Sequence, residues 1–197
     1  GFTFHSIGGR YWVEDAAYEL SAAEVDVLED ASNALEQLCL AAVEHVVERG
    51  QFDRLNIDAR AAALATESWR RRRRNVIGRF DLHFDGSAPP KLYEYNADTP
   101  TALFEAAVAQ WHWFEELKIR GDQFNSIHER LIEAWKACGA GRETLYFACD
   151  PDSDEDRVTT EYLRDTATQA GRATDFIALG DIGLDKGRLV MELGAGQ

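Results

Sequence analysis

A β-hairpin is encoded by Gly78-Arg79-Phe80-Asp81-Leu82-His83-Phe84 and, after a turn, by Lys91-Leu92-Tyr93-Glu94-Tyr95-Asn96-Ala97-Asp98-Thr99-Pro100. Polar and apolar residues alternate in both arms, which is the period of a β-strand. Residues 85–90, Asp-Gly-Ser-Ala-Pro-Pro, supply turn chemistry between the arms. The segment therefore predicts an antiparallel pair formed by residues 79–84 and 91–96.

The alternation also predicts which side chains meet. We expect Asp81 opposite Glu94 and Arg79 opposite Asn96 on the polar face. The same register gives three pairs on the other face: Phe84 with Lys91, Leu82 with Tyr93, and Phe80 with Tyr95. A slip of two residues is the alternative; it sets Asp81 opposite Asn96 and still keeps the polar face together.

Two carboxylates opposed across a strand pair repel each other, and a divalent cation turns that repulsion into a binding site. Oxygen ligands from Asp81, Glu94 and Asn96 suit Mg²⁺, which proteins often hold together with substrate phosphates. The neighbouring Arg79 can grip a phosphoryl oxygen. The alternative interpretation is ordinary surface charge on a solvent-facing strand.

The motifs Gly-Arg-Phe-Asp at 78–81 and YEYNADTPTALFEAA at 93–107 resemble the glutathionylspermidine synthase family, ligases of the ATP-grasp type. The similarity is closer to the stand-alone synthetase-like members, and it extends to residues 11–15, 69–73 and 107–111. The resemblance implies that Arg79 and Asp81 meet ATP, with Arg79 in the catalytic role, and that Asp81, Glu94 and Asn96 bind Mg²⁺. It also implies an α/β fold with a mixed sheet and packed helices, the N-terminal portion of an ATP-grasp-type ligase.

The implied activity is an ATP- and Mg²⁺-dependent carboxylate–amine ligase that works through an acyl phosphate. The family points to glutathione and spermidine, but residues 99–102, Thr-Pro-Thr-Ala, depart from its pattern. The acid is thus glutathione-like or another peptide or amino acid, and the amine is polyamine-like. Because the family needs a further large segment, we expect this chain to be the front part of a longer enzyme or a short form. A truncated, non-catalytic domain that binds Mg²⁺ and nucleotide is the alternative function.

Composition narrows the class of protein. The chain has 197 residues, 45% of them hydrophobic, and a net charge of −14, which argues against a nucleic-acid binder and favours cationic partners such as metals or amines. It has no run of 18 apolar residues and no signal-peptide pattern, so no membrane association is expected. Three scattered cysteines give neither a disulfide framework nor a zinc motif and fit a reduced cytoplasm.

Helices are expected before and after the hairpin. A capping box at residues 21–24 opens a helix that ends at Gly50, and its apolar stripe is Val25, Leu28, Leu35, Leu38, Ala42 and Val46. A second helix runs from Asp58 to about residue 74 and ends in five arginines, either a solvated helix end or partly a phosphate-holding group. Thr99-Pro100 predicts an N-cap and first turn, where Thr99 either caps the helix or meets an anionic substrate. Tryptophans 111, 113 and 135 are expected in the core.

The last third of the chain changes character. A capping box at residues 126–129 opens a helix that ends near Gly139, and 144–149 and 173–179 read as strands flanking a helix, which predicts parallel pairing. A further strand-like run covers 188–193. Glu155 and Asp156 match family substrate-contacting acids by position, or are ordinary partners of the helix dipole. We expect two domains: residues 1–142, helices plus the hairpin, and an incomplete strand–helix–strand subdomain at 143–197.

Overall fold

The computed structural model describes residues 2–6, 9–138, 143–185 and 188–191. The chain forms two compact units, one made of residues 1–17 and 99–197 and the other of residues 18–98. Both contain helices and small sheets, which confirms the predicted α/β class. The domain boundary predicted after residue 142 stays a prediction, since that residue lies outside the described part.

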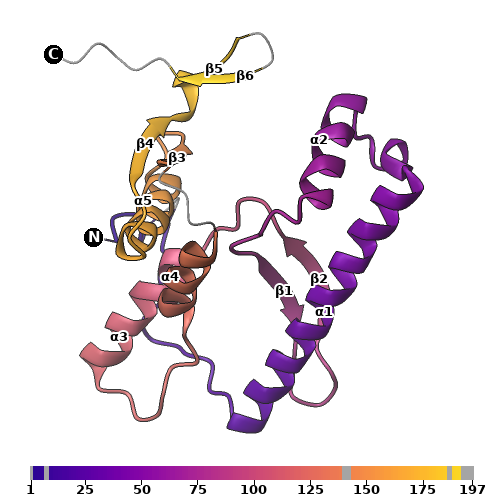
Figure 1. Cartoon of the computed structure of the whole chain (residues 1–197). Coiled ribbons are helices and arrows are strands. Elements are labelled where there is room, and N and C mark those ends of the chain that lie inside the picture. Colours follow the sequence, from indigo (N-terminus) through magenta and orange to yellow (C-terminus); the bar gives the residue numbers. More distant parts are fainter. Residues whose placement is uncertain (1, 7–8, 139–142, 186–187, 192–197) are drawn as a thin grey trace, which may run out of the picture. The chain divides into compact units, whose positions relative to one another are not determined.

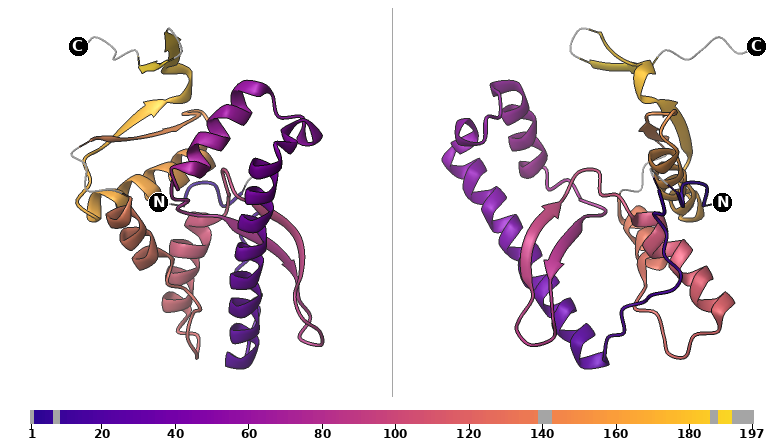
Figure 2. Two further views of the ribbon diagram at one scale, coloured as in Figure 1. Left: turned by 45° about the vertical axis from the view of Figure 1, so that its right-hand side comes forward. Right: turned by 180° about the vertical axis from the view of Figure 1, so that it is seen from behind.

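The unit of residues 18–98 carries the hairpin against a long helix (Figure 1). Its elements are α1 (Ala22–Arg49), η1 (Gln51–Leu55), α2 (Ala59–Arg70), β1 (Arg79–His83) and β2 (Lys91–Asn96). All views show β1 and β2 alongside α1, and α2 turning back toward α1 (Figure 2). The helix thus serves as the backing on which the hairpin is held.

Helix α1 begins and ends as the sequence predicts. Ser21 Oγ accepts a hydrogen bond from the Glu24 amide at 3.3 Å, and Glu24 Oε2 accepts one from the Ser21 amide at 2.7 Å. The Ser21 amide and then its hydroxyl hold the pKa of Glu24 below its ordinary value. Gly50, at φ 62°, ends the helix by donating its N–H to the carbonyls of Val46 and Val47.

The expected apolar stripe of α1 is wrong at two positions. The side chain of Leu38 is 65% exposed and Ala42 is also exposed, whereas Glu36 and Cys39 are half-buried. The helical period continues from Leu35 to Cys39, four residues on, rather than to Leu38. A polar residue, Glu36, therefore faces the rest of the unit.

Helix α2 starts at its expected cap but ends earlier than predicted. Asp58 Oδ1 accepts hydrogen bonds from the amides of residues 60 and 61, both at 2.8 Å. The helix stops at Arg70, not near residue 74, because Arg72 takes a left-handed conformation at φ 50°. Arg71 pairs with Glu67 at 2.5 Å, with both side chains more than half exposed, so this arginine is a surface residue.

The hairpin has the predicted register near its open end. Arg79 pairs with Asn96, Phe80 with Tyr95, and Asp81 with Glu94. Between Asp81 and the turn of the hairpin, a β-bulge shifts the register, so that Leu82 pairs with Leu92 and His83 pairs with Lys91. The pairs expected for Leu82 with Tyr93 and for Phe84 with Lys91 are therefore wrong, and β1 ends one residue before Phe84.

The bulge places two leucines opposite each other. Tyr93 is the extra residue of β2, and its side chain is 73% exposed. The shift brings Leu92 opposite Leu82, because directly paired side chains lie on the same face. Leucine thus meets leucine, and the polar end keeps its own register. The turn beyond is closed by Asp85 Oδ1, which accepts hydrogen bonds from the amide and hydroxyl of Ser87 at 2.9 and 2.8 Å.

The other unit contains the strand–helix–strand motif. Its elements are η2 (Glu105–Ala109, π-helical), α3 (Gln110–Leu117), α4 (Ile127–Ala137), β3 (Leu145–Cys149), α5 (Asp154–Gln169), β4 (Thr174–Ala178), η3 (Leu179–Asp181), β5 (Ile182–Asp185) and β6 (Arg188–Met191). Strands β3 and β4 pair in parallel, as predicted. The antiparallel pair of β5 and β6 includes a strand, β5, that the sequence analysis did not predict, and the last residues of the run at 188–193 lie outside the described part.

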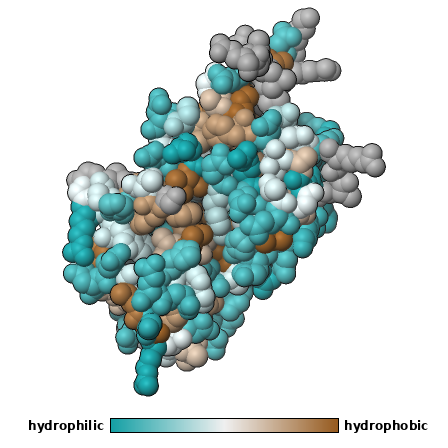
Figure 3. All heavy atoms as spheres, turned by 90° about the vertical axis from the view of Figure 1, so that its left-hand side faces the viewer, coloured by the Kyte–Doolittle hydropathy of each residue, from teal (hydrophilic) through white to brown (hydrophobic). Residues whose placement is uncertain are grey.

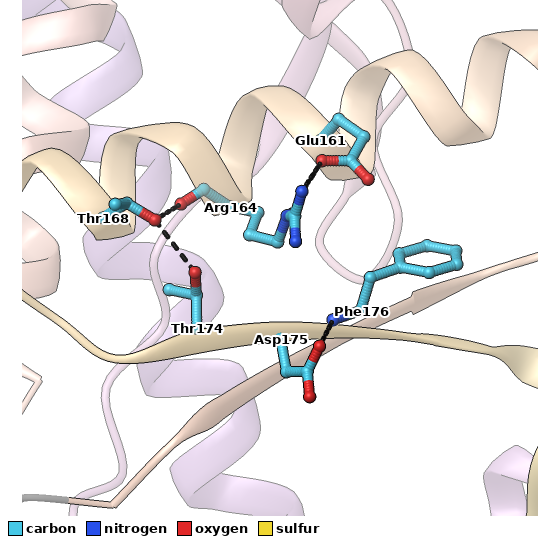
Figure 4. A network of polar contacts seen from close by, with 6 residues as sticks. All are labelled: Glu161, Arg164, Thr168, Thr174, Asp175 and Phe176. Carbon is cyan, nitrogen blue, oxygen red and sulfur yellow. Dashed lines mark hydrogen bonds and ion pairs between the residues drawn. The ribbon is translucent and has the colours of Figure 1, made fainter. Parts of the chain in front are cut away.

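Polar contacts hold α5 on the sheet (Figure 4). Thr168 Oγ1 donates to the carbonyl of Arg164 at 2.9 Å and lies 2.9 Å from Thr174 Oγ1 of β4. Arg164 also pairs with Glu161 one turn earlier at 2.7 Å. On the face of α5 toward α4, Trp135 Nε1 donates to the buried Thr166 hydroxyl at 3.0 Å.

Three predictions about the helices of this unit are wrong. The helix expected at Thr99-Pro100 begins at Leu103, because Ala102 is left-handed at φ 63° and interrupts the turn. Ser126 makes no capping hydrogen bond from its side chain; the amide of the first helical residue instead donates to Asn125 Oδ1 at 3.1 Å. Trp111 is 42% exposed and thus lies outside the core.

The surface is mixed in hydropathy, as expected for a chain with 45% hydrophobic and 28% charged residues. On the face drawn in Figure 3, apolar side chains lie in several separate places among hydrophilic ones. Across the part of the chain that the structure describes, no helix combines the length and the apolar character needed to cross a bilayer. The three cysteines are free thiols, with Cys149 buried and the other two half-buried.

Ser21 and Ser126, which both begin a Ser-x-x-Glu pattern before a helix, give a matched test of the fold. Ser21→Ala removes a capping box, so the first-turn amides of α1 should exchange hydrogen faster by about fivefold, the equivalent of about 1 kcal/mol. Ser126 begins the same Ser-x-x-Glu pattern before α4, but its side chain makes no capping bond. Hydrogen exchange in α4 should therefore change little in Ser126→Ala. Hydrogen exchange of peptides from each helix measures both, and equal acceleration in the two helices would contradict the assignment.

Candidate functional site

The polar end of the hairpin gathers four side chains predicted from sequence. Asp81 of β1 lies opposite Glu94 of β2, and Arg79 lies opposite Asn96. Alternation places Arg79 and Asp81 on one face of β1, and direct pairing places their partners on that same face of β2. The hairpin therefore presents two carboxylates, one amide and one guanidinium together.

Arg79 contacts Asp81 through two hydrogen bonds. Its Nε donates to Oδ1 at 2.7 Å and its Nη2 donates to Oδ2 at 3.2 Å, a fork that matches the carboxylate plane. These bonds are the largest reason that the pKa of Asp81 lies below its ordinary value, while desolvation acts in the opposite direction. About a third of each side chain is exposed, so the Asp81 carboxylate is accessible. Its lowered pKa keeps it ionised at neutral pH.

The second strand supplies the remaining oxygen ligands. Asn96 Nδ2 donates to Glu94 Oε1 at 3.0 Å, an arrangement that leaves the amide oxygen of Asn96 available to a cation. Within the described residues, no three or more acids, histidines and cysteines gather as a metal group. The set here is two carboxylates and an amide, which fits Mg²⁺ only where substrate phosphates or water complete its six ligands.

One strand residue is anchored to the long helix, which the sequence analysis missed. Tyr95 Oη donates to Glu36 Oε2 at 2.8 Å, and Asn75 Nδ2 donates to Glu36 Oε1 at 3.1 Å. The ring of Tyr95 stacks on Phe80, with centroids 4.2 Å apart. Partial burial and then Glu36 raise the pKa of Tyr95 to about 12, so it remains a hydrogen-bond donor at neutral pH. A polar residue on the inner face of α1 is the signal that could have revealed this contact.

The other predicted substrate residues lie in the second unit. Thr99 precedes the helical segment by four residues and is exposed, so it does not cap that helix. Glu155 and Asp156 lie in the first turn of α5, where the Asp156 amide donates to the hydroxyl of Ser153 at 3.3 Å. Glu155 is half-buried and Asp156 is exposed. Acids at this helix end are stabilised by its dipole, so their position fits either of the expected roles.

A second missed feature links two segments that carry the family resemblance. Tyr11 Oη donates at 2.6 Å to Glu105 Oε1, and the Glu105 side chain is only 4% exposed. Glu105 opens the π-helical turn η2, a form that is rare and frequent at functional sites. Beside this turn lies a pocket of about 920 Å³ whose lining includes Trp12, Phe104 and Trp113.

Together these features define a class. A mixed α/β chain with small sheets and a parallel strand–helix–strand unit is consistent with a pre-ATP-grasp domain of a ligase. A sequence model described as glutathionylspermidine synthase preATP-grasp matches residues 1–194, and the chain belongs to this family. The resemblance inferred from the two motifs is thereby confirmed.

Named relatives agree with this class. A Haemophilus influenzae protein, named provisionally as an acid–amine ligase, is 37% identical over 193 residues, which cover 93% of this chain and 49% of that protein. The bifunctional glutathionylspermidine synthetase/amidase of Escherichia coli is 32% identical over 123 residues, 60% of this chain and 19% of the enzyme. Trypanothione synthetase of Crithidia fasciculata is 32% identical over 111 residues, 53% of this chain and 16% of the enzyme. The chain thus spans about half the length of the Haemophilus relative and less of the others.

The contact between Arg79 and Asp81 gives a pH prediction. In Arg79→Lys the two-point hydrogen bond is lost, so the pKa of Asp81 should rise toward the ordinary value of 3.8. A depressed carboxyl pKa stabilises the fold above the unfolded-state pKa, and this contribution disappears as the pH falls through the folded-state pKa. Carboxyl ¹³C NMR titration in Mg²⁺-free buffer measures the change; an unaltered Asp81 titration in the variant would contradict it.

Proposed function

We propose that the protein containing this chain is an ATP- and Mg²⁺-dependent carboxylate–amine ligase, and that Asp81, Glu94 and Asn96 hold Mg²⁺. The observation that carries the proposal is the pairing of Asp81 with Glu94 beside Arg79 on one hairpin face. Opposed carboxylates are unfavourable on a strand pair unless a cation lies between them or close by. When bound, Mg²⁺ supplies positive charge that neutralises the phosphates of ATP.

The reaction needs positioning and charge neutralisation rather than a nucleophile from the protein. The substrate carboxylate attacks the γ-phosphorus of ATP, so that a carboxyl oxygen–phosphorus bond forms and ADP leaves. The amine then attacks the acyl carbon, and phosphate leaves. Arg79 contributes to the first step by placing its guanidinium against the oxygens of the phosphoryl group in transfer. The same donors contact Asp81 in the structure, so they already point at the polar face.

The substrate classes follow from the relatives' names and the residues present. The glutathionylspermidine synthetase of Escherichia coli is named for a product that joins glutathione to spermidine. We assign the acid of this protein to glutathione-like or other peptide or amino-acid carboxylates, with Thr99 as a contact. Glu155 and Asp156 suit a cationic amine because both are carboxylates at the start of α5. A net charge of −14 favours the same class of partner.

A second function fits the same site. A domain that binds Mg²⁺ and nucleotide without turnover needs the two carboxylates and the amide, but it does not need the phosphoryl contact of Arg79. The pairing of β1 with β2 places the two carboxylates and the amide on one face, which is what this alternative needs. Turnover by the full-length protein distinguishes the two functions.

The metal site predicts the nucleotide affinity. In full-length protein, ATP should bind tightly only with Mg²⁺, and Asp81→Asn or Glu94→Gln should each weaken binding by at least about tenfold, because each removes a charged ligand. Asp53→Asn, an exposed acid of η1 in the same unit, is the control and should bind like the wild type. Isothermal titration calorimetry measures all four proteins. Wild-type affinity in both site variants would remove the metal assignment.

The ligase predicts a catalytic role for Arg79. Arg79→Lys keeps the charge but loses the planar fork, so kcat should fall by about 10² to 10³ while ATP affinity changes much less. The assay is ADP release by full-length protein with spermidine and glutathione first, then other amines and acids. Tight Mg²⁺–ATP binding without ADP release from any pair would favour the non-catalytic domain. If the protein turns over and Arg79→Lys keeps an unchanged kcat, the ligase activity stands but the catalytic role of Arg79 does not.

A further inference from the structure

A glycine directly before Arg79 makes room for the ring of Tyr95. A Cβ atom at Gly78 would lie 2.5 Å from Tyr95 Cε2, 2.7 Å from Oη and 2.9 Å from Cζ. Carbon atoms pack at about 3.5 to 4.0 Å, so no larger residue fits unless the ring moves. Gly78 does not adopt a left-handed conformation, so the requirement for glycine is one of space alone.

The same ring is fixed at two further points. Phe80, two residues along from Gly78, stacks on it at a centroid distance of 4.2 Å and an interplanar angle of 26°. The hydroxyl of Tyr95 donates to Glu36 of α1, and Glu36 also accepts a hydrogen bond from Asn75 in the segment that leads into β1. A helix, a connecting segment and both strands therefore meet at one tyrosine.

The position of this tyrosine on β2 matters for the site. Tyr95 lies between Glu94 and Asn96, and alternation directs its side chain to the face opposite theirs. Fixing Tyr95 thus fixes the backbone from which the carboxylate and the amide project. Gly78 does the same for β1, because Arg79 follows it directly and pairs with Asn96.

We propose that Gly78, Tyr95 and Glu36 form a positioning cluster that sets the separation between the ligands on β1 and those on β2. Tyr95 is a positioning residue: its side chain lies on the face opposite those of Glu94 and Asn96, and it acts through these two residues. Direct hydrogen-bond partners of metal ligands change metal affinity by about 10- to 100-fold when they are removed. Tyr95 acts one step further back, through the strand backbone, so we expect the lower end of that range. This role rests on the proposed Mg²⁺ site.

Two substitutions test the cluster, each with a matched control. Tyr95→Phe keeps the stacked ring and removes the hydroxyl that donates to Glu36. Tyr93→Phe makes the same change at the exposed tyrosine of the bulge. Gly78→Ala displaces the ring; Gly180→Ala adds the same methyl group where nothing lies within 4 Å. The readout in full-length protein is the Mg²⁺ concentration that gives half-maximal ATP binding, with thermal unfolding in Mg²⁺-free buffer to confirm folding.

Tyr95→Phe and Gly78→Ala should each raise this Mg²⁺ concentration by at least about tenfold while ATP still saturates at high Mg²⁺, and both controls should match the wild type. If Gly78→Ala fails to fold, Tyr95→Phe alone decides. A wild-type Mg²⁺ requirement in the folded variants, with Glu94→Gln impaired, overturns the positioning role and leaves the metal site standing. A wild-type requirement in Glu94→Gln as well removes the metal site, and the positioning role falls with it.

Discussion

The polar end of the hairpin is organised by the opposition of Asp81 and Glu94. Two like charges on directly paired residues destabilise a strand pair. A two-stranded hairpin is by itself only marginally stable, so this repulsion has to be offset. The structure offsets the repulsion with the Arg79 fork on Asp81 and the Asn96 amide on Glu94. Each carboxylate therefore has a donor from its own strand, and together they remain a concentrated negative site that a cation can join.

Such a site depends on a rigid support. Tyr95 ties β2 to α1 through Glu36, while the bulge at Tyr93 confines the register change to the distal half of the hairpin. The bulge brings leucine opposite leucine and leaves the pairing from Arg79 to Asp81 intact. Packing and polar geometry are thus satisfied on separate stretches of the same two strands.

The gathering of Arg79, Asp81, Glu94 and Asn96 on one hairpin face could be predicted from sequence because strand alternation is local and places them without tertiary information. The register beyond Asp81 could not, since choosing between Leu92 and Tyr93 as the partner of Leu82 depends on packing that alternation does not contain. The helix boundaries failed for a similar reason. Arg72 and Ala102 adopt left-handed conformations that non-glycine residues rarely take, and Ser126 carries a capping pattern whose role Asn125 fills.

Glu36 shows where pattern and chemistry diverge most. A carboxylate on the inner face of a helix contradicts an apolar stripe, and partial burial is unfavourable unless donors satisfy it. Both oxygens of Glu36 accept hydrogen bonds, from Tyr95 and from Asn75. Phenylalanine at 95 would pack on Phe80 equally well but would leave one oxygen of Glu36 without this donor. A tyrosine whose hydroxyl reaches a helix 59 residues earlier in the chain thus favours one position of the strand over nearby ones. Unique placement is the property that a metal site needs and that apolar packing alone supplies less sharply.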